Sequence, residues 1–390
     1  MFRNLFIDVS RLLERFLHGR LPTGVDRVNL AYLQRFGADA RAVVQHGRIR
    51  RLASRETSRR LFDLIADPKA DFGRRLGVIM AHACLWSWSS QDGAGGLYFN
   101  LSHTGIEDPT FSHWVRRSRL RPIFFVHDLI PLTHPEYCQP GDSERHHHRL
   151  TNMLAVGAGI VANSHDTLRQ LEDFAFRQSQ PMVAAEVAHL GLGLRVHGRH
   201  APVEPPLLLP GPYFVVLGTI EPRKNHLLLL QVWRRLAEAH GLATPRLLVI
   251  GQRGWECENV VDLLERSTAI GAHVTELPVC SDAHLAHYLH NACALLFPSF
   301  AEGYGMPLAE ALGAGLPVIA SDLNVFREIA GAIPDYLNPL DGVGWQQAIE
   351  DYARPASARR DDQLKRLAGY RAPTWDAHFD TVDRLMARLA

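Results

Sequence analysis

The chain has 390 residues, of which 46% are hydrophobic and 21% are charged, and its formal net charge is +1. This length predicts two domains, and the near-zero charge argues against a protein dedicated to nucleic-acid binding. No uninterrupted apolar run reaches the roughly 18 to 20 residues that a membrane-spanning helix needs.

The N-terminal stretch MFRNLFIDVSRLLERF carries charged residues within its apolar pattern and has no small-residue cleavage site. This pattern is not that of a signal peptide, so we expect the protein to be cytoplasmic. The five cysteines are an odd number and form no CxxC pair. A disulfide framework or a thiolate zinc site is therefore not expected.

Short apolar runs alternate with amphipathic segments of helical length along most of the chain. The expected strands lie at 5–10, 77–84, 96–102, 122–130, 159–164 and 183–190, and then at 213–219, 246–251, 273–279, 294–299 and 317–322. Alternation of this kind predicts an α/β protein with parallel sheets that helices cover on both faces.

A proline-rich segment at 197–212 lacks periodicity and is typical of a linker. It predicts a first domain at 1–200 and a second at 208–372. The final segment, about 374–390, has the apolar spacing of a helix that returns to the first domain. In two doubly wound domains that face a central cleft, ligands bind at the carboxyl ends of the strands.

The segment FAEGYGMPLAEALGAG (300–315) follows an expected strand and opens an expected helix. Pro307 is expected to be the first residue of that helix, whose N-terminus offers free N–H groups. Gly303 and Gly305 allow a ligand to approach the backbone closely. Together these features predict a site for an anion, most naturally a phosphate.

Two glutamates, Glu302 and Glu310, lie on either side of this expected phosphate site. Carboxylates accept hydrogen bonds from neutral hydroxyl groups. A ligand with a diphosphate in the middle and polyols at both ends is a nucleotide sugar. The alternative is that Glu310 only complements the helix dipole and Glu302 is only a surface charge.

The segment GTIEPRKNH (218–226) follows the first strand of the second domain. Arg223 and Lys224 there would neutralise a diphosphate, and Asn225 is expected to cap the next helix. Lys224 is one of three lysines beside 39 arginines, which suggests that its compact ammonium group is required. The alternative is a solvated pair of cations, although cations oppose the dipole at a helix start.

Two segments of the first domain carry weaker signals. In FFVHDLIPLTHPEY (124–137), His127 could bind a sugar hydroxyl while Asp128 orients it, although a lone histidine is more often structural. In PTGVDRVNLAYL (22–33), Thr23 is expected to cap a helix, and Gly24 would let a phosphate or an acceptor approach.

Residues 48–65, RIRRLASRETSRRLFDLI, are rich in arginine in a pattern compatible with a helix. Such a helix is either simply solvated or makes a peripheral contact with an anionic membrane. The three consecutive histidines at 146–148 lie in an expected helix, where they point in different directions and do not predict a metal cluster. No two aspartates are two positions apart, so no Asp-x-Asp metal motif is present, and we expect neither a metal nor a cofactor.

These segments together resemble the retaining nucleotide-sugar glycosyltransferases of family four, which have the GT-B fold of two Rossmann-like domains. The resemblance covers most of the chain and is strongest at 218–322, where a glutamate, seven residues and a second glutamate form the family signature. The HDLIP and GTIEPRKN segments are similar to the bacterial polysaccharide branch, many of whose members are mannosyltransferases. The resemblance thus implies transfer of a sugar to a glycan or a polyprenyl-linked oligosaccharide, and the expected donor is GDP-mannose.

The resemblance also implies a role for each matching residue. Glu302 would contact the donor sugar, Glu310 the ribose hydroxyls, and His127 the transferred sugar in the cleft. Arg223 and Lys224 would hold the diphosphate. The backbone of 303–306 would contact the sugar and the phosphate. The implied donor-binding residues also include Gly218, Thr219, Gly303, Tyr304, Gly305, Met306 and Pro307. Thr219 departs from the family, many of whose members have arginine there, and Arg223 would substitute for it.

Other classes of protein fit less well. A nicotinamide oxidoreductase would need GxGxxG and a P-loop kinase GxxxxGK[ST], and neither string occurs. A sugar-nucleotide epimerase on the same fold would not normally carry the glutamate pair. A non-catalytic glycan-binding protein stays open as a further alternative.

Overall fold

The computed structural model describes residues 4–20, 22–86, 88–89, 93, 95–192, 207 and 209–389, without the side chains of 82–89. The chain forms two compact units. Unit 1 comprises Met1–Thr133, Pro140–Arg199 and Pro373–Ala390, and unit 2 comprises His134–Gln139 and His200–Ala372. Most of the expected linker at 197–212 lies outside the described residues.

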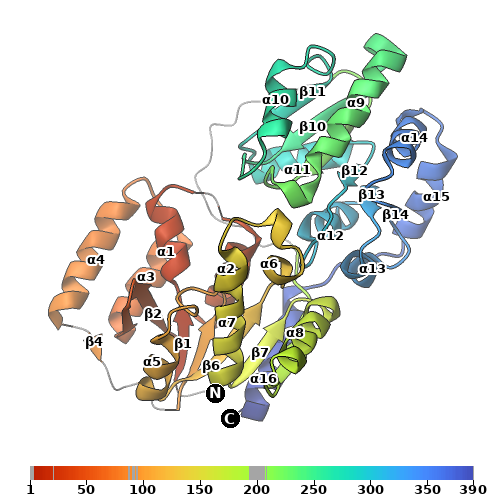
Figure 1. The fold of residues 1–390 in the computed structure, drawn as a ribbon. Helices are drawn as coiled ribbons and strands as arrows, with labels where there is room; N and C mark the ends of the chain where they lie inside the picture. The colour runs from red at the N-terminus through yellow and green to blue at the C-terminus, as the bar shows by residue number, and fades with distance from the viewer. Residues whose placement is uncertain are drawn as a thin grey trace. The chain divides into compact units, whose positions relative to one another are not determined.

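Unit 1 is built on an eight-stranded sheet in the order β4-β3-β2-β1-β5-β6-β7-β8 (Figure 1). Its strands are β1 (Leu5–Asp8), β2 (Ala40–His46), β3 (Ile49–Ala53), β4 (Trp88–Ser89), β5 (Leu97–Asn100), β6 (Arg121–Val126), β7 (Gly159–Ala162) and β8 (Ala184–Val187). β3 pairs antiparallel with β2 and β4, and the other pairs are parallel. The buried side chains of β1, β5 and β6 form the centre of the core.

Helices cover the sheet of unit 1. They are α1 (Ser10–Leu17), α2 (Gly24–Phe36), α3 (Arg55–Ala66), α4 (Phe72–Trp86), α5 (Phe111–Ser118), α6 (Ile130–Thr133), α7 (Asp142–Val156), α8 (His165–Arg177) and α16 (Trp375–Leu389). The last helix, α16, packs against β7 and β8 through an apolar face that includes Leu385 and Met386.

Unit 2 is built on a six-stranded sheet, all parallel, in the order β11-β10-β9-β12-β13-β14. Its strands are β9 (Tyr213–Leu217), β10 (Arg246–Ile250), β11 (Val274–Leu277), β12 (Leu295–Phe297), β13 (Val318–Ser321) and β14 (Asp335–Leu337). Its helices are α9 (His226–His240), α10 (Glu258–Arg266), α11 (Asp282–Asn291), α12 (Met306–Gly313), α13 (Asn324–Ala330), α14 (Gly342–Ala353) and α15 (Ala358–Leu367), with short 3₁₀ turns at Pro135–Tyr137, Pro222–Lys224 and Gly241–Ala243.

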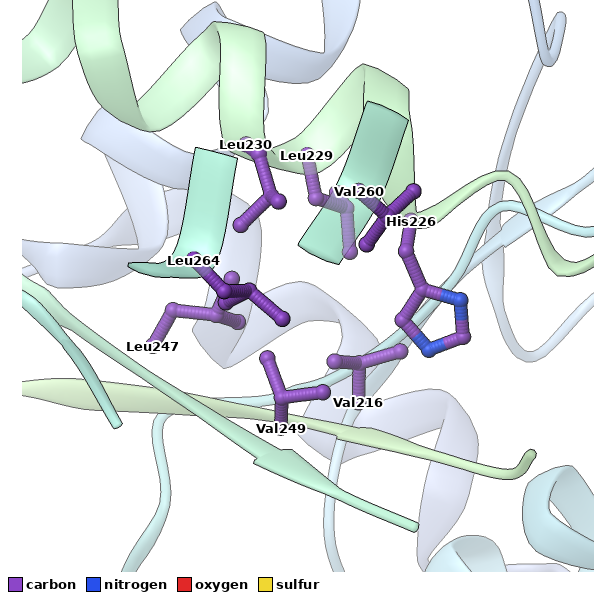
Figure 2. Close-up of a pocket in the computed structure, with 8 residues that line it drawn as sticks. All are labelled: Val216, His226, Leu229, Leu230, Leu247, Val249, Val260 and Leu264. Carbon is purple, nitrogen blue, oxygen red and sulfur yellow. The ribbon is translucent and has the colours of Figure 1, made fainter. Parts of the chain in front are cut away.

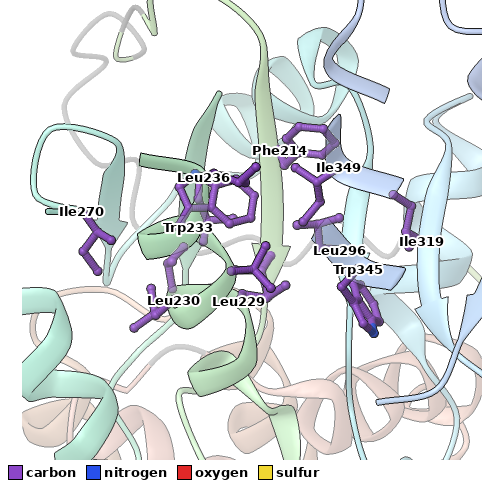
Figure 3. Close-up of a cluster of buried hydrophobic side chains, with 14 of the residues drawn as sticks. Phe214, Leu229, Leu230, Trp233, Leu236, Ile270, Leu296, Ile319, Trp345 and Ile349 are labelled. Atoms are coloured by element: carbon purple, nitrogen blue, oxygen red, sulfur yellow. The ribbon is translucent and has the colours of Figure 1, made fainter. Parts of the chain in front are cut away.

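Figure 3 shows the core of unit 2, where α9 and α14 pack on the sheet. Trp233 of α9 packs edge-on against Phe214 of β9, with ring centroids 6.0 Å apart, and Trp345 of α14 is fully buried. Burying such large side chains removes a great deal of apolar surface from water and is the main favourable contribution to the stability of this unit.

Ten of the eleven expected strands overlap observed ones, so the expectation of two parallel-sheet α/β domains is confirmed. The expected strand at 77–84 is wrong, because these residues lie within α4. A short apolar run fits a strand or a helix equally well by periodicity alone. The expected helix at 48–65 is also wrong over its first part, which forms β3 and then turns into α3.

Candidate active site

The loops that follow β9 and β12 carry the two main sequence motifs of unit 2. These strands are neighbours in the sheet, with Leu295 paired to Val215, although about 80 residues separate them in the chain. Because neighbouring parallel strands end at the same edge, the loops after them meet there. The backbone N–H of Phe300 donates to the carbonyl oxygen of Arg223 at 2.8 Å, which joins the two loops.

Glu302 lies at the centre of the charged groups at this edge. Its carboxylate accepts hydrogen bonds from Arg223 Nη1 at 2.8 Å, from Lys224 Nζ and from Ser299 Oγ at 2.7 Å. Burial raises its pKa, but Lys224 and Arg223 outweigh this effect and hold the pKa at about 2. Glu302 is therefore ionised at neutral pH and is fixed in one orientation.

Lys224 and Arg223 are held differently. The side chain of Lys224 is 10% exposed, and its ammonium group lies 5.1 Å from the ring centroid of Phe297. Burial lowers its pKa, although Glu302 acts in the opposite direction. Arg223 reaches Glu302 on one side and Glu221 on the other, where its Nη2 lies 2.6 Å from Oε1.

The expected capping role of Asn225 is wrong. This residue has a left-handed backbone (φ +56°), and its side chain makes no capping hydrogen bond to α9. The side-chain amide instead donates to the carbonyl oxygens of Pro339, at 2.8 Å, and Pro298, at 3.2 Å. Asn225 therefore connects the loop after β9 to the segments after β12 and β14.

The helix α12 begins directly after the loop that carries Glu302. Gly305 precedes it with φ +97°, and a Cβ atom there would lie 2.7 Å from the Phe326 ring, so only glycine fits. The helix begins at Met306, one residue earlier than predicted, so that Pro307 is its second residue. Gly303 and Tyr304 complete the loop, and Glu310 lies further along α12, half-buried.

A second glycine-dependent contact lies beside the loop after β9. A Cβ atom on Gly251 would lie 1.9 Å from the carbonyl oxygen of Gly218, so the loop after β10 can approach β9 only with glycine at this position. A Cβ atom on Gly254 would similarly lie 2.8 Å from the methyl group of Thr219. The expected donor-binding residues Gly218 and Thr219 are thus packed against the loop after β10.

Figure 2 shows a narrow gap below α9, lined by His226 and by aliphatic side chains of α9, α10, β9 and β10. Its volume is about 180 Å³, but it is too narrow to hold a water molecule. Burial, and then Lys224, lowers the pKa of His226 to about 4, so the ring is neutral. The gap is part of the core of unit 2 and not a ligand site.

In unit 1, the residues that follow β6 form a second candidate site. His127 Nε2 lies 2.7 Å from the carbonyl oxygen of Leu101, which can only accept, so Nε2 carries the proton and Nδ1 is left as an acceptor. Burial lowers the pKa of His127, and the ring is therefore neutral at pH 7. Asp128 Oδ1 accepts from the backbone N–H of Ile130 at 3.1 Å and fixes the start of α6.

The loop before α2 is fixed by a buried carboxylate that the sequence analysis missed. Asp26 accepts hydrogen bonds at 2.7 Å from both the N–H and the hydroxyl group of Thr23, and it also pairs with Arg11 and Arg15. Its charge and that of Arg11 act on His127. The spacing of Thr23 and Asp26 is that of a capping box, which is the signal that could have identified it. Asp26 thereby holds Gly24 at the start of α2.

The structure thus brings together Arg223, Lys224 and Glu302 in unit 2, and it places His127, Asp128 and Gly24 in unit 1. Besides Asp26, the sequence analysis missed Glu221 and Ser299, both of which lie within three positions of a predicted site residue. Among the described residues, no group of three or more His, Cys, Asp or Glu side chains could hold a metal ion.

Solved structures with a similar fold are glycosyltransferases of GT-B type. Anabaena Alr3699/HepE, in complex with UDP and glucose, superposes with a TM-score of 0.65 at 13% identity and covers 99% of this chain and 100% of its own. Sucrose-phosphate synthase from Thermosynechococcus elongatus gives a TM-score of 0.63 at 16% identity, with 99% of each chain covered. The protein therefore has the GT-B fold.

The sequence of unit 2 matches a known family model. Residues 204–332 match the family of glycosyl transferases group 1, so the chain contains a group 1 glycosyltransferase domain. The serotype-specific mannosyltransferase WbdA of Escherichia coli is 30% identical over 251 residues, which are 59% of this chain and 29% of that protein. O-antigen chain mannosyltransferase B of E. coli is 33% identical over 163 residues, 40% of this chain and 42% of that protein. The chain thus spans less than a third of the WbdA sequence that it matches.

Proposed function

We propose that this protein is a retaining glycosyltransferase that moves a sugar from a nucleotide-sugar donor to a glycan or lipid-linked glycan in bacterial surface polysaccharide synthesis. The observation that carries the proposal is the contact of Glu302 with Arg223 and Lys224. Glu302 lies in the loop that leads through Gly305 into α12. A carboxylate for sugar hydroxyls and cations for a diphosphate then lie side by side.

Each part of the donor has a proposed partner in unit 2. The positive charges of Lys224 and Arg223 and the N–H groups at the start of α12 favour the diphosphate, and the helix dipole acts in the same direction. The backbone of 303–306 contacts the sugar and the phosphate, while Glu302 accepts hydrogen bonds from the sugar. Glu310 binds the ribose hydroxyls from within α12.

The transfer step follows from this arrangement. Negative charge develops on the diphosphate as its bond to the sugar breaks, and the fixed positive groups stabilise that charge. The acceptor hydroxyl attacks from the face that the diphosphate leaves, its proton passes to the departing phosphate oxygen, and the anomeric configuration is retained. The protein supplies no nucleophile and no metal ion in this scheme. His127 accepts a hydrogen bond from the transferred sugar through Nδ1.

We propose GDP-mannose as the donor. The support is that relatives at 30% and 33% identity are named mannosyltransferases. A thermal-shift screen of GDP-, UDP- and ADP-sugars tests this choice, and a larger shift with a UDP-sugar than with GDP-mannose would replace it. An NMR assay of the product's anomeric configuration then tests retention.

A peripheral contact of unit 1 with an anionic membrane is a further part of the proposal. No helix among the described residues is long and apolar enough to cross a bilayer. Of the arginines at 48–65, Arg50 is buried and donates to Gln45, but Arg55 and Arg59 are exposed on α3. The adjoining helices α1 and α4, which pack against α3, expose Leu17 (51%) and Val78 (65%). Exposed apolar and basic groups together suit an anionic lipid surface.

Two other functions are separated from this one by a single assay. A sugar-nucleotide epimerase would change the donor sugar without an acceptor, and a glycan-binding protein would leave the donor intact. Donor consumption measured with and without an acceptor glycan therefore distinguishes the three. We expect consumption to rise strongly when the acceptor is present.

A further inference from the structure

The two cations of the donor site differ in how many of their N–H groups are already used. Both terminal nitrogens of Arg223 are directed at protein oxygens: Nη1 donates to Glu302 at 2.8 Å and to the carbonyl oxygen of Ala301 at 3.1 Å, and Nη2 lies 2.6 Å from Glu221. The planar guanidinium is thus fixed between two carboxylates. This geometry suits a residue that fixes the positions of Glu221 and Glu302.

Lys224 keeps donors for a ligand. An ammonium group has three N–H donors, and the described contacts use one of them, toward Glu302. Gly218 is a near neighbour of the lysine: a Cβ atom there would lie 3.4 Å from Lys224 Cε, so a side chain at this position would pack against the lysine, and glycine leaves that space open. Lys224 can therefore contact a diphosphate while it stays paired with Glu302.

Glu221 anchors the far side of Arg223. Its side chain is 3% exposed, and the charged groups that face it are Arg223, Lys224 and Glu302. Burial raises its pKa, while Arg223 and Lys224 act to lower it. A buried acid of this kind is costly unless it is paired, so the contact with Arg223 constrains both side chains. The result is a continuous series of contacts from Glu221 through Arg223 to Glu302 and Lys224.

We propose that Glu221 is a positioning residue of the donor site, which through Arg223 fixes Glu302 for the sugar, and that Lys224 is the cation that contacts the leaving diphosphate. This inference rests on the proposed function and assigns different roles to the two cations. Glu221 and Arg223 set the position of the sugar-binding carboxylate, whereas Lys224 contributes directly to binding of the nucleoside diphosphate.

The test compares Glu221→Gln, Arg223→Lys and Lys224→Ala for binding of GDP by calorimetry and for steady-state transfer. UDP is used if the wild type does not bind GDP. We expect Glu221→Gln and Arg223→Lys to lower kcat/KM for the sugar donor by about tenfold or more but to leave nucleoside diphosphate affinity within about threefold. Lys224→Ala should lower that affinity by about tenfold or more.

Two further variants separate positioning from a general loss of structure. Glu221→Asp keeps the carboxylate and should recover part of the lost kcat/KM. Glu265→Gln, which breaks the exposed pair between Glu265 and Arg253 in the same unit, should leave every parameter unchanged. Melting temperatures of all variants identify any that fail to fold.

Three outcomes would overturn the inference. Arg223→Lys could lose as much nucleoside diphosphate affinity as Lys224→Ala, which would make Arg223 a direct phosphate contact. Glu221→Gln could keep the wild-type kcat/KM, which would make Glu221 purely structural. A wild type that binds neither GDP nor UDP would instead overturn the proposed function, and this inference with it.

Discussion

Lys224 and Glu302 form a buried ion pair across 78 positions of sequence, at the edge where β9 and β12 end side by side. Neither side chain is more than 10% exposed. An isolated charge at this depth would be expensive, so the pair and its partners Arg223 and Ser299 stabilise one another.

The first prediction concerns stability at low pH. The folded pKa of Glu302 is about 2 and its ordinary value is 4.5, so its ionisation stabilises the fold above pH 4.5 and this contribution is lost as the pH falls toward 2. Between pH 6 and pH 3 the loss is about 2 kcal/mol. Urea unfolding of the wild type and of Glu302→Gln should show their difference narrowing by that amount. Parallel pH profiles would mean that the ion pair does not form.

The second prediction separates the two glutamates of the signature. Glu310→Ala should weaken the binding of GDP and of GDP-mannose alike, by about 1 to 3 kcal/mol, because the ribose hydroxyls of both ligands lose their acceptor. Glu302→Ala should weaken the sugar donor far more than GDP. Titration calorimetry with both ligands measures these differences. Unchanged GDP affinity in Glu310→Ala would remove the ribose assignment.

The third prediction concerns His127. If Nδ1 accepts a hydrogen bond from the transferred sugar, His127→Ala should lower turnover by about tenfold or more and leave GDP affinity nearly unchanged. His148→Ala is the matched control, because His148 is exposed on α7 and should not affect either quantity. Wild-type turnover in His127→Ala would return this histidine to a structural role.

The fourth prediction is that transfer does not need a divalent metal. Lys224, Arg223 and the start of α12 provide positive charge at the proposed position of the leaving diphosphate, so we expect no magnesium ion to be required there. Activity should survive excess EDTA, whereas Lys224→Ala should lose orders of magnitude in turnover. Loss of activity in EDTA that added magnesium or manganese restores would contradict the assignment of the cations.

The fifth prediction tests the membrane contact of unit 1. The wild type should co-sediment with vesicles of phosphatidylcholine and phosphatidylglycerol at low salt and dissociate as salt screens the arginines. Val78→Asp should weaken this binding, since it places a charge on the exposed face of α4. Leu242→Asp, at a leucine that is 97% exposed in unit 2, should not. Failure of the wild type to sediment with these vesicles would end the proposal.

The fold class and the main motifs could be predicted because they depend on neighbouring residues. Alternation of short apolar runs with amphipathic segments reflects the side-chain periods of strands and helices. The start of α12 was predicted within one residue, because Pro307 fits the first turn and Gly305 adopts a backbone that other residues rarely do. Elements with ambiguous local patterns were not found correctly: the apolar run at 77–84 belongs to α4, and β2, β3, β4 and β14 were missed.

The sequence by itself determined which residue types the proposed donor site contains, since Glu302, Arg223 and Lys224 stand in recognisable motifs. Only the tertiary structure decided how they are paired. The order of strands in the sheet makes β9 and β12 neighbours, and this places Glu302 between Arg223 and Lys224. The tertiary structure also decided that Asn225 binds distant carbonyl oxygens instead of capping α9 and that Glu221 pairs with Arg223. Such contacts depend on burial and on which strands pair, and neither is encoded in the spacing of nearby residues.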